Sequence, residues 1–270
     1  MYVLRKLVAF LWLTVSEFLC PAGMRRVVHS SINGHSLLVF ANEDVGRAIH
    51  YGGRYEALET AFLTKTISPE AICVDVGANV GYFTMLMANS ARTGSVHAFE
   101  PLPMNVALLK ASIELNGFTN IHVNQCAVGD RTGEISFVQS TDTAYSSLRD
   151  TGRKLAEHAF RVPMITLDDY LERVGITRVD VIKADVEGSE ELVVEGATKL
   201  LNNRAARPRL VLLELFNHNL QAFGSSVAGV VQKMGSLGYA PFVLNRQGHT
   251  IPFTPAMAAR HYNVWFRPAH

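Results

Sequence analysis

The pattern of apolar positions around residue 77 predicts a buried strand that leads into a helix. Residues 72–76 form an almost unbroken apolar run, and apolar residues return at helical spacing at Val80, Phe83 and Met87. The loop 77–81 between them begins and ends with glycine. Glycine lets a ligand approach the backbone closely, and the first N–H groups of the following helix face such a ligand. The stretch therefore predicts the opening of a βαβ unit.

Apolar runs and helical spacing continue to alternate along the rest of the chain. Strands are expected over residues 72–76, 95–99, 120–126, 179–184, 210–215, 239–244 and 261–266, with helices between most of them. Such alternation requires right-handed crossovers and predicts an α/β, Rossmann-like, largely parallel sheet with helices on both faces. Residues 131–163 follow neither period and read as short strands and polar loops.

The chain ahead of residue 69 is predicted to be a small cap rather than an independent domain. Asn33-Gly34 is a strong hairpin signal, because both residues tolerate positive φ. A helix from about Gly53 to Thr66 then leads into the first core strand. We therefore divide the chain into an N-terminal helix and hairpin cap, residues 1–68, and a ligand-binding domain, residues 69–270.

The first 20 residues combine a basic start with an apolar middle. Arg5 and Lys6 precede an apolar run over residues 7–19, which is too short for a membrane span and has no clear signal-peptidase site. We interpret the run as an uncleaved amphipathic helix. It is expected to pack on protein or on a partner, with membrane-surface contact through residues 3–19 as the alternative.

Composition narrows the class of protein. The net charge is +1 and 48% of the residues are hydrophobic, so a sizeable core is available. No basic stripe with interleaved aromatics is present, which argues against a nucleic-acid partner. Cys20, Cys73 and Cys126 have no metal-ligand spacing and fit a reducing compartment, so we expect a cytoplasmic protein with or without membrane association.

Two acidic residues at strand ends point to the ligand. A dinucleotide site would have G-x-G-x-x-G where this chain has G-x-x-x-G. Asp75, at the end of the first core strand, would repel a pyrophosphate but attract an ammonium or sulfonium group. Glu100, followed by Pro101, ends the next strand about 20 residues after the loop, where an acid accepts hydrogen bonds from ribose hydroxyls. This pattern favours S-adenosyl-L-methionine (SAM) over a dinucleotide.

With these motifs in this order, the chain resembles the FkbM family of SAM-dependent methyltransferases. The matching motifs are Gly53 to Glu56, Val74 to Thr84, Ala98 to Pro101, Ala127 to Asp130, Ile165 to Leu171 and Ile182 to Gly188. The resemblance implies a class I methyltransferase sheet of seven strands with the last one antiparallel. It also implies methylation of a hydroxyl, often on a sugar or a polyketide-like small molecule.

The resemblance also assigns roles to individual residues. The methionine half of SAM is expected against the loop residues Asp75, Gly77, Ala78, Asn79 and Gly81. Glu100 is expected to bind the ribose, Pro101 and Leu102 to lie beside the adenine, and the Ala127 backbone to line its edge. Asp185 is expected to face the methyl group and the substrate.

An alcohol must lose its proton when it is methylated, so a general base is expected. Asp185 is the first candidate, and a mere ion pair with Lys183 is the alternative reading. Glu214 and His218, at and just past the fifth core strand, are further candidates. Glu187 is expected to compensate the positive end of the following helix.

Asp185 and Glu214 could between them hold a divalent metal ion, but none is expected, because no histidine cluster supports it. The expected partner is a small-molecule or glycan hydroxyl acceptor, with 131–163 contributing to a lid, and self-association into a homo-oligomer is compatible with the sequence. Two other functions stay open at this point, namely an NAD(P)-dependent oxidoreductase and a SAM-binding module without turnover.

Overall fold

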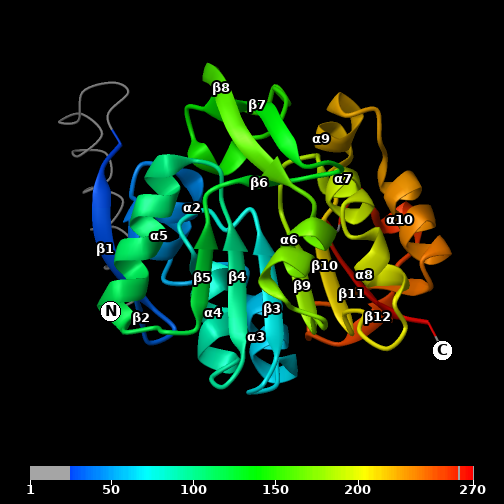
Figure 1. Cartoon of the computed structure of the whole chain (residues 1–270). Helices are drawn as coiled ribbons and strands as arrows, with labels where there is room; N and C mark the ends of the chain where they lie inside the picture. Colours follow the sequence, from blue (N-terminus) through cyan, green and yellow to red (C-terminus); the bar gives the residue numbers. More distant parts are fainter. Residues whose placement is uncertain (1–24, 261, 270) are drawn as a thin grey trace.

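The computed structural model describes residues 25–260 and 262–269, and a mixed β-sheet runs through the centre of this part (Figure 1). Its strands are β3 (Ile72–Val76), β4 (Ser95–Phe99), β5 (Ile121–Asn124), β9 (Val181–Ala184), β10 (Leu210–Glu214), β11 (Tyr239–Leu244), β12 (Thr250–Pro252) and β13 (Asn263–Pro268). The order across the sheet is β12-β11-β13-β10-β9-β3-β4-β5.

The strand directions are those expected for a class I methyltransferase sheet. β5, β4, β3, β9 and β10 run parallel, and the last strand, β13, is antiparallel between β10 and β11. β12 extends the sheet beyond the seven strands that were expected, since it pairs antiparallel with the outer side of β11. The prediction of seven strands was therefore one strand short, because a three-residue edge strand carries no periodic signal.

Both faces of the sheet are buried because successive side chains of a strand point to opposite sides. Val74, Ile182 and Leu213 share one core with the helices α6 (Leu167–Val174), α7 (Glu190–Glu195), α8 (Thr198–Asn202) and α10 (Val227–Ser236). Their chain neighbours Cys73 and Leu212 belong to the core on the other face, with α3 (Ala57–Thr66), α4 (Tyr82–Ser90) and part of α5 (Pro103–Asn116). The predicted two-sided arrangement of helices is confirmed.

The N-terminal hairpin packs on the main domain. Its strands β1 (Val27–Ile32) and β2 (His35–Phe40) are joined by Asn33 and Gly34 with φ of 52° and 80°, as the sequence predicted. The backbone N–H of Leu38 donates to the hydroxyl of Ser112 on α5 at 2.9 Å. Helix α2 (Asp44–His50) follows the hairpin, and α3 begins at Ala57, later than expected. The N-terminal amphipathic helix predicted over residues 3–19 lies outside the described residues.

The aperiodic region forms a second, smaller sheet. β7 (Gly133–Ser140) and β8 (Ala156–Ile165) form an antiparallel ribbon joined through the 3₁₀ helix η1 (Thr143–Tyr145), and β6 (Ala127–Val128) pairs parallel with β8. The ribbon stands over the carboxyl ends of the parallel strands (Figure 1). The expectation that 120–126 is one strand followed by a turn at Ala127 is wrong, because the chain passes there from the main sheet into the second sheet.

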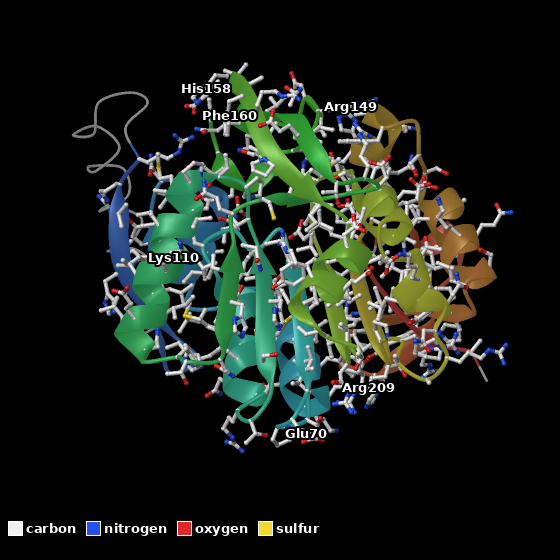
Figure 2. All side chains as sticks on the ribbon, viewed as in Figure 1. Glu70, Lys110, Arg149, His158, Phe160 and Arg209 are labelled. Carbon is white, nitrogen blue, oxygen red and sulfur yellow. The ribbon has the colours of Figure 1, made fainter. Side chains whose placement is uncertain are left out.

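The amino-terminal and carboxyl-terminal edges of the main sheet lie on opposite sides of the molecule. In Figure 2, Glu70 and Arg209 lie at the amino-terminal edge of the main sheet, far from His158 and Phe160 on β8. Arg209 donates to the Ser68 hydroxyl at 3.0 Å, so that edge is closed by surface contacts. The helix expected over 189–201 is split into α7 and α8, and α9 (Asn217–Ala222) was not predicted. Within the described residues, the helices are too short or too polar to cross a membrane.

Candidate functional site

A cavity opens at the carboxyl edge of the main sheet, below the second sheet. Its walls are the loop after β3, the tips of β4, β9 and β10, and the connection between β7 and β8. Of the residues predicted to form the site, those that line it are Asp75, Gly77, Ala78, Asn79, Glu100, Pro101, Ala127, Asp185 and Glu214. The structure therefore brings together residues that are far apart in the sequence, as expected for strand tips in a parallel sheet.

The glycine loop is shaped by two close approaches. Gly77 has φ of 77°, and a Cβ there would lie 1.9 Å from the carbonyl oxygen of Asp185. Gly81 has φ of 94°, and a Cβ there would lie 2.3 Å from Cδ1 of Leu109 on α5. Gly81 does not line the cavity. Its predicted role as a ligand contact is therefore replaced by a packing role, whereas Gly77 brings the loop against the tip of β9.

Asp75, which lines this cavity, has one carboxylate oxygen that accepts no hydrogen bond. The carboxylate is fully buried, and Oδ2 accepts a hydrogen bond from the Thr84 hydroxyl at 2.6 Å. Oδ1 has no hydrogen-bond partner, and the nearest cation, Nζ of Lys183, is 3.9 Å away. Burial raises the pKa of Asp75, with Lys183 acting in the opposite direction. A positively charged ligand group would satisfy the unpartnered oxygen.

Glu100 is held in place at the tip of β4. Its Oε2 accepts the backbone N–H of Asn79 at 2.8 Å, and its Oε1 accepts the backbone N–H of Leu102 at 2.9 Å. Burial raises the pKa of Glu100 to about 7. Each carboxylate oxygen can accept a second hydrogen bond, so the side chain is oriented by the backbone and still able to bind hydroxyl groups in the cavity.

Three carboxyl groups meet next to this part of the cavity, at the tips of β9 and β10 and in the loop after β9. Oxygens of Asp185, Glu187 and Glu214 all lie within 4.8 Å of one another. Two cations accompany them, since Nζ of Lys183 is 3.4 Å from Oδ2 of Asp185 and Nη1 of Arg153 is 2.8 Å from Oε2 of Glu187. This cluster contains two of the three candidate catalytic residues.

The members of this cluster differ in charge. Burial alone would raise the pKa of Asp185, but Lys183 and a hydrogen bond with Glu214 outweigh it and hold that pKa below its ordinary value. Burial and the charge of Asp185 raise the pKa of Glu214 well above its ordinary value. The same two causes raise the pKa of Glu187 to about 8. Asp185 is therefore ionised near neutral pH, and Glu214 is the protonated partner that donates to it.

Glu187 does not have the role that was expected. It has φ of 55°, its side chain is turned toward the cavity, and it pairs with Arg153. The backbone at the start of α7 is instead satisfied by Glu190, whose carboxylate accepts the N–H groups of Val186 at 3.1 Å and of Gly188 at 3.1 Å. The prediction that Glu187 compensates the helix was wrong, since Glu190 performs that function.

His218 lies outside the cavity wall. It is on α9, its side chain is exposed, and its Nε2 lies 2.9 Å from the carbonyl oxygen of Thr151. That contact joins α9 to the connection between η1 and β8. The structure therefore removes His218 from the candidate bases and leaves Asp185 and Glu214.

Several residues of the site were not assigned a role from the sequence. Arg153 lies between two aromatic rings, with its guanidinium carbon 4.3 Å from the ring centre of Tyr145 and 4.9 Å from that of Phe216. Arg153 and Tyr145 line the cavity, as do Lys183 and Tyr55. Lys183 and Tyr55 belong to the sequence motifs named above, so the sequence could have pointed to both as residues of the site. Arg153 lies in the aperiodic region, where nothing marked it.

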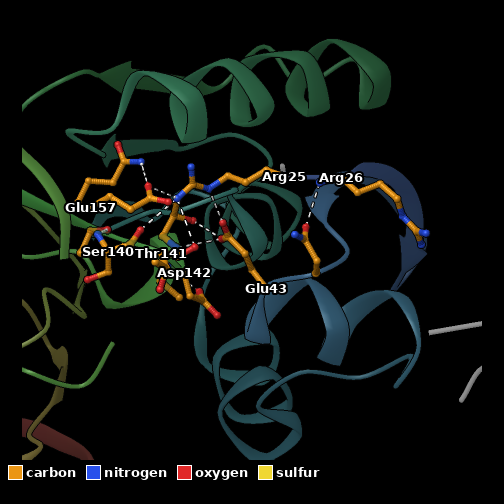
Figure 3. Close-up of polar contacts among 12 residues, drawn as sticks. Arg25, Arg26, Glu43, Ser140, Thr141, Asp142 and Glu157 are labelled. Atoms are coloured by element: carbon orange, nitrogen blue, oxygen red, sulfur yellow. Dashed lines mark hydrogen bonds and ion pairs between the residues drawn. The ribbon is translucent and has the colours of Figure 1, made fainter. Parts of the chain in front are cut away.

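A polar network ties the lid to the N-terminal segment (Figure 3). Arg25 pairs with Glu43 at 2.7 Å and with Glu157 at 2.9 Å, and it donates to the carbonyl of Ser140 at 3.1 Å. The second oxygen of Glu43 accepts the backbone N–H of Thr143 at 3.1 Å. The network fixes the β7–η1 connection against the loop before α2, and so positions the cavity wall around η1.

A glycine loop after the first core strand, an acid at the tip of the next and a carboxylate at the tip of β9 together define a class I methyltransferase site. The sequence profile of the methyltransferase FkbM domain matches residues 75–241. Since this is more than half of the chain, the protein belongs to the FkbM methyltransferase family. The alternative of an NAD(P)-dependent oxidoreductase is thereby ruled out.

Individual relatives are similar over the same region. The chain is 23% identical over 176 residues to "Methyltransferase 1" of Beauveria bassiana, a match that covers 58% of this chain and 71% of that protein. It is 29% identical over 164 residues to the 31-O-demethyl-FK506 methyltransferase FkbM of Streptomyces tacrolimicus, covering 48% of this chain and 60% of that protein. The match therefore spans less than two thirds of the second relative.

Two solved structures are similar to parts of this chain at low identity. A methyltransferase FkbM from Methylobacillus flagellatus has a TM-score of 0.48 and 15% identity, over 74% of this chain and 44% of that one. An O-methyltransferase from Bacillus cereus has a TM-score of 0.45 and 11% identity, over 80% of this chain and 83% of that one.

Proposed function

We propose that this protein is a SAM-dependent O-methyltransferase that acts on a hydroxyl of a small molecule or a sugar. The observation that carries the proposal is the unpartnered Oδ1 of Asp75, which is fully buried at the wall of the cavity beside the glycine loop. A cationic ligand satisfies that oxygen, and the sulfonium and ammonium groups of SAM are cationic. The close approach at Gly77 places the glycine loop directly against Asp185, so that the two parts of the site adjoin.

The residues present fit the parts of SAM. Asp75, Gly77, Ala78 and Asn79 would hold its methionine half, and Glu100 would accept hydrogen bonds from its ribose. Pro101 and Ala127, which also line the cavity, would lie beside the adenine. When bound, SAM supplies a methyl group that its sulfonium has already activated for transfer.

The chain's own contribution to the reaction is alignment and removal of a proton. Asp185 is ionised and its side chain is 24% exposed, so its carboxylate reaches the cavity and can accept the proton of the acceptor hydroxyl. Lys183 and protonated Glu214 hold this carboxylate in one orientation. The wall around η1 lines the same cavity, where it would hold the acceptor in a reactive position.

The nature of the acceptor is supported by the relatives' names. One is a 31-O-demethyl-FK506 methyltransferase, and another is the 2-O-methyltransferase NoeI of Sinorhizobium fredii, which is 24% identical over 147 residues. Aromatic and apolar residues of the lid, among them Phe137, Tyr145 and Leu148, line the cavity and suit the hydrocarbon faces of such molecules. Incubation of cell extracts with labelled SAM and the protein, followed by mass spectrometry, tests the proposal. A labelled product supports it, and SAM binding without any transfer indicates a binding module.

Replacing Glu100 tests where the ribose lies. Glu100→Ala is expected to weaken the binding of S-adenosylhomocysteine by roughly 1.5–3 kcal/mol, the usual value of hydrogen bonds to a charged group. Isothermal titration calorimetry measures the change, and Glu114→Ala, an exposed position on α5, is the matched control. Equal affinity of the Glu100 variant and the unmodified protein would sink the ribose assignment.

Chelation tests the expectation that no metal takes part. Asp185, Glu187 and Glu214 are close enough to hold a cation, but Lys183 and Arg153 already lie against two of them and supply positive charge. We therefore expect the same methyl-transfer rate with EDTA as with added Mg²⁺. Loss of activity with EDTA that Mg²⁺ restores would contradict this and assign a metal to the three carboxylates.

A further inference from the structure

Tyr55 joins the cavity wall from the motif at residues 53–56, which lies ahead of the profile match over residues 75–241. Its ring packs edge-on against Tyr82, with ring centres 5.3 Å apart, and lies 6.2 Å from that of Phe83. Both partners are in the first turn of α4, directly after the glycine loop. Tyr55 therefore lies next to the start of α4, where the glycine loop ends.

The backbone of Tyr55 is held firmly in this position. Its carbonyl oxygen accepts hydrogen bonds from the hydroxyl of Tyr82 at 3.0 Å and from the hydroxyl of Thr60 at 3.1 Å. The Tyr82 hydroxyl in turn accepts from Nδ2 of Asn33 at the hairpin turn, at 3.0 Å. Contacts from the hairpin, α3 and α4 thus converge on one residue of the wall.

Glu56 stands directly behind Tyr55. It has φ of 39°, a left-handed conformation that a residue other than glycine adopts only when its surroundings enforce it. Although it occupies the position before α3, its side chain does not cap that helix. The carboxylate is hydrogen bonded to Tyr55 instead, and its Oε2 accepts from Nδ2 of Asn263 on β13 at 3.3 Å. Glu56 does not itself line the cavity, so it acts on the site through Tyr55.

Positive charge is scarce on this side of the cavity. Lys183 is faced by four carboxyl groups, those of Asp185, Asp75, Glu56 and Glu214. Asp75 Oδ1 is buried at the cavity wall without a hydrogen-bond partner. An unpartnered oxygen and an excess of carboxyl groups beside the glycine loop together call for a cationic group from the ligand.

We propose that Tyr55 binds the ammonium group of SAM's methionine half, and that Glu56 behind it positions Tyr55 and supplies negative charge. The proposal rests on the function proposed above and adds to it a subsite from the N-terminal segment. Such a subsite also explains why the N-terminal segment packs on the methyltransferase domain. The methyltransferase unit then begins before residue 55, rather than at the start of the β3 strand.

The test compares two ligands that differ at the amino-acid end. S-adenosylhomocysteine carries the ammonium group, and 5′-methylthioadenosine has the same adenosine and thioether without it. Calorimetry is expected to show that the unmodified protein prefers S-adenosylhomocysteine. Tyr55→Phe and Glu56→Gln are each expected to weaken its binding about tenfold or more, the usual effect of losing a charge-assisted hydrogen bond, and to leave methylthioadenosine binding unchanged.

Two controls separate this effect from others. Glu59→Gln removes the same charge from the first turn of α3, at a residue that does not line the cavity, and is expected to preserve the preference for S-adenosylhomocysteine. Glu100→Ala is expected to weaken both ligands equally, because both contain the ribose.

Several results would overturn the proposal. Equal weakening of both ligands by Tyr55→Phe and Glu56→Gln would show a general structural effect. Unchanged affinities, with a raised KM for an acceptor, would move the pair to the acceptor side. Equal affinity of the unmodified protein for the two ligands would exclude an ammonium subsite. If it bound neither ligand, the SAM assignment itself would fall with the proposal.

Discussion

Replacement of Asp185 by asparagine is expected to lower methyl-transfer turnover by roughly 10²–10⁴, the usual contribution of a general base. The substitution keeps the size of the side chain and much of its hydrogen bonding, but it removes the group that takes the acceptor's proton. Affinity for S-adenosylhomocysteine is expected to change much less, because the proposed cofactor contacts lie on Asp75, Glu100 and the glycine loop. Turnover and calorimetric affinity measured on one purified variant provide the two readouts.

The pH dependence gives an independent check on this role. The pKa of Asp185 is held below its ordinary value of 3.8, so this base is ionised throughout the range from pH 5 upward. Its protonation is therefore not expected to limit the rate of the unmodified enzyme in that range. A parallel loss of cofactor binding and turnover in Asp185→Asn would make Asp185 a SAM ligand instead. Unchanged turnover would transfer the base role to Glu214.

Gly77→Ala is expected to lower the free energy of unfolding by about 3–5 kcal/mol and to abolish cofactor binding. At φ of 77° an alanine is strained, and its Cβ would lie 1.9 Å from the backbone oxygen of Asp185. Backbone atoms cannot move aside as a flexible side chain does, so either the loop or the tip of β9 must shift. Both carry residues of the proposed site.

Gly34→Ala is the matched control for this change. Gly34 has nearly the same φ, 80°, and a Cβ there would have no neighbour within 4 Å. It is therefore expected to cost only the conformational penalty, about 1–2 kcal/mol, and to leave cofactor binding intact. Denaturant titration and calorimetry on both variants make the comparison. If the two variants lost equal stability, the close approach at Gly77 would not matter.

The sequence by itself determined the main sheet and one side of the site. Asp75 and Glu100 each end an apolar run, and parallel strands place such ends at one edge of the sheet. The glycine loop, the tip of β9 with Asp185 and the hairpin turn at Asn33 were all predicted, because each depends on a short local pattern. The one expected loop contact that failed, Gly81, has the local geometry of the motif but faces α5 rather than the cavity.

Only the tertiary structure decided the rest of the site. The second sheet pairs β6 with β8 at residues 37 positions apart, Ala127 with Met164, and such pairing leaves no periodic signal in a strand whose outer half is exposed. The same long-range folding places Arg153 between two rings and brings Glu56 to Asn263. It also turns Glu187 into the cavity and His218 away from it. The direction of a side chain depends on the backbone angles and packing around it, which residue type and spacing do not specify.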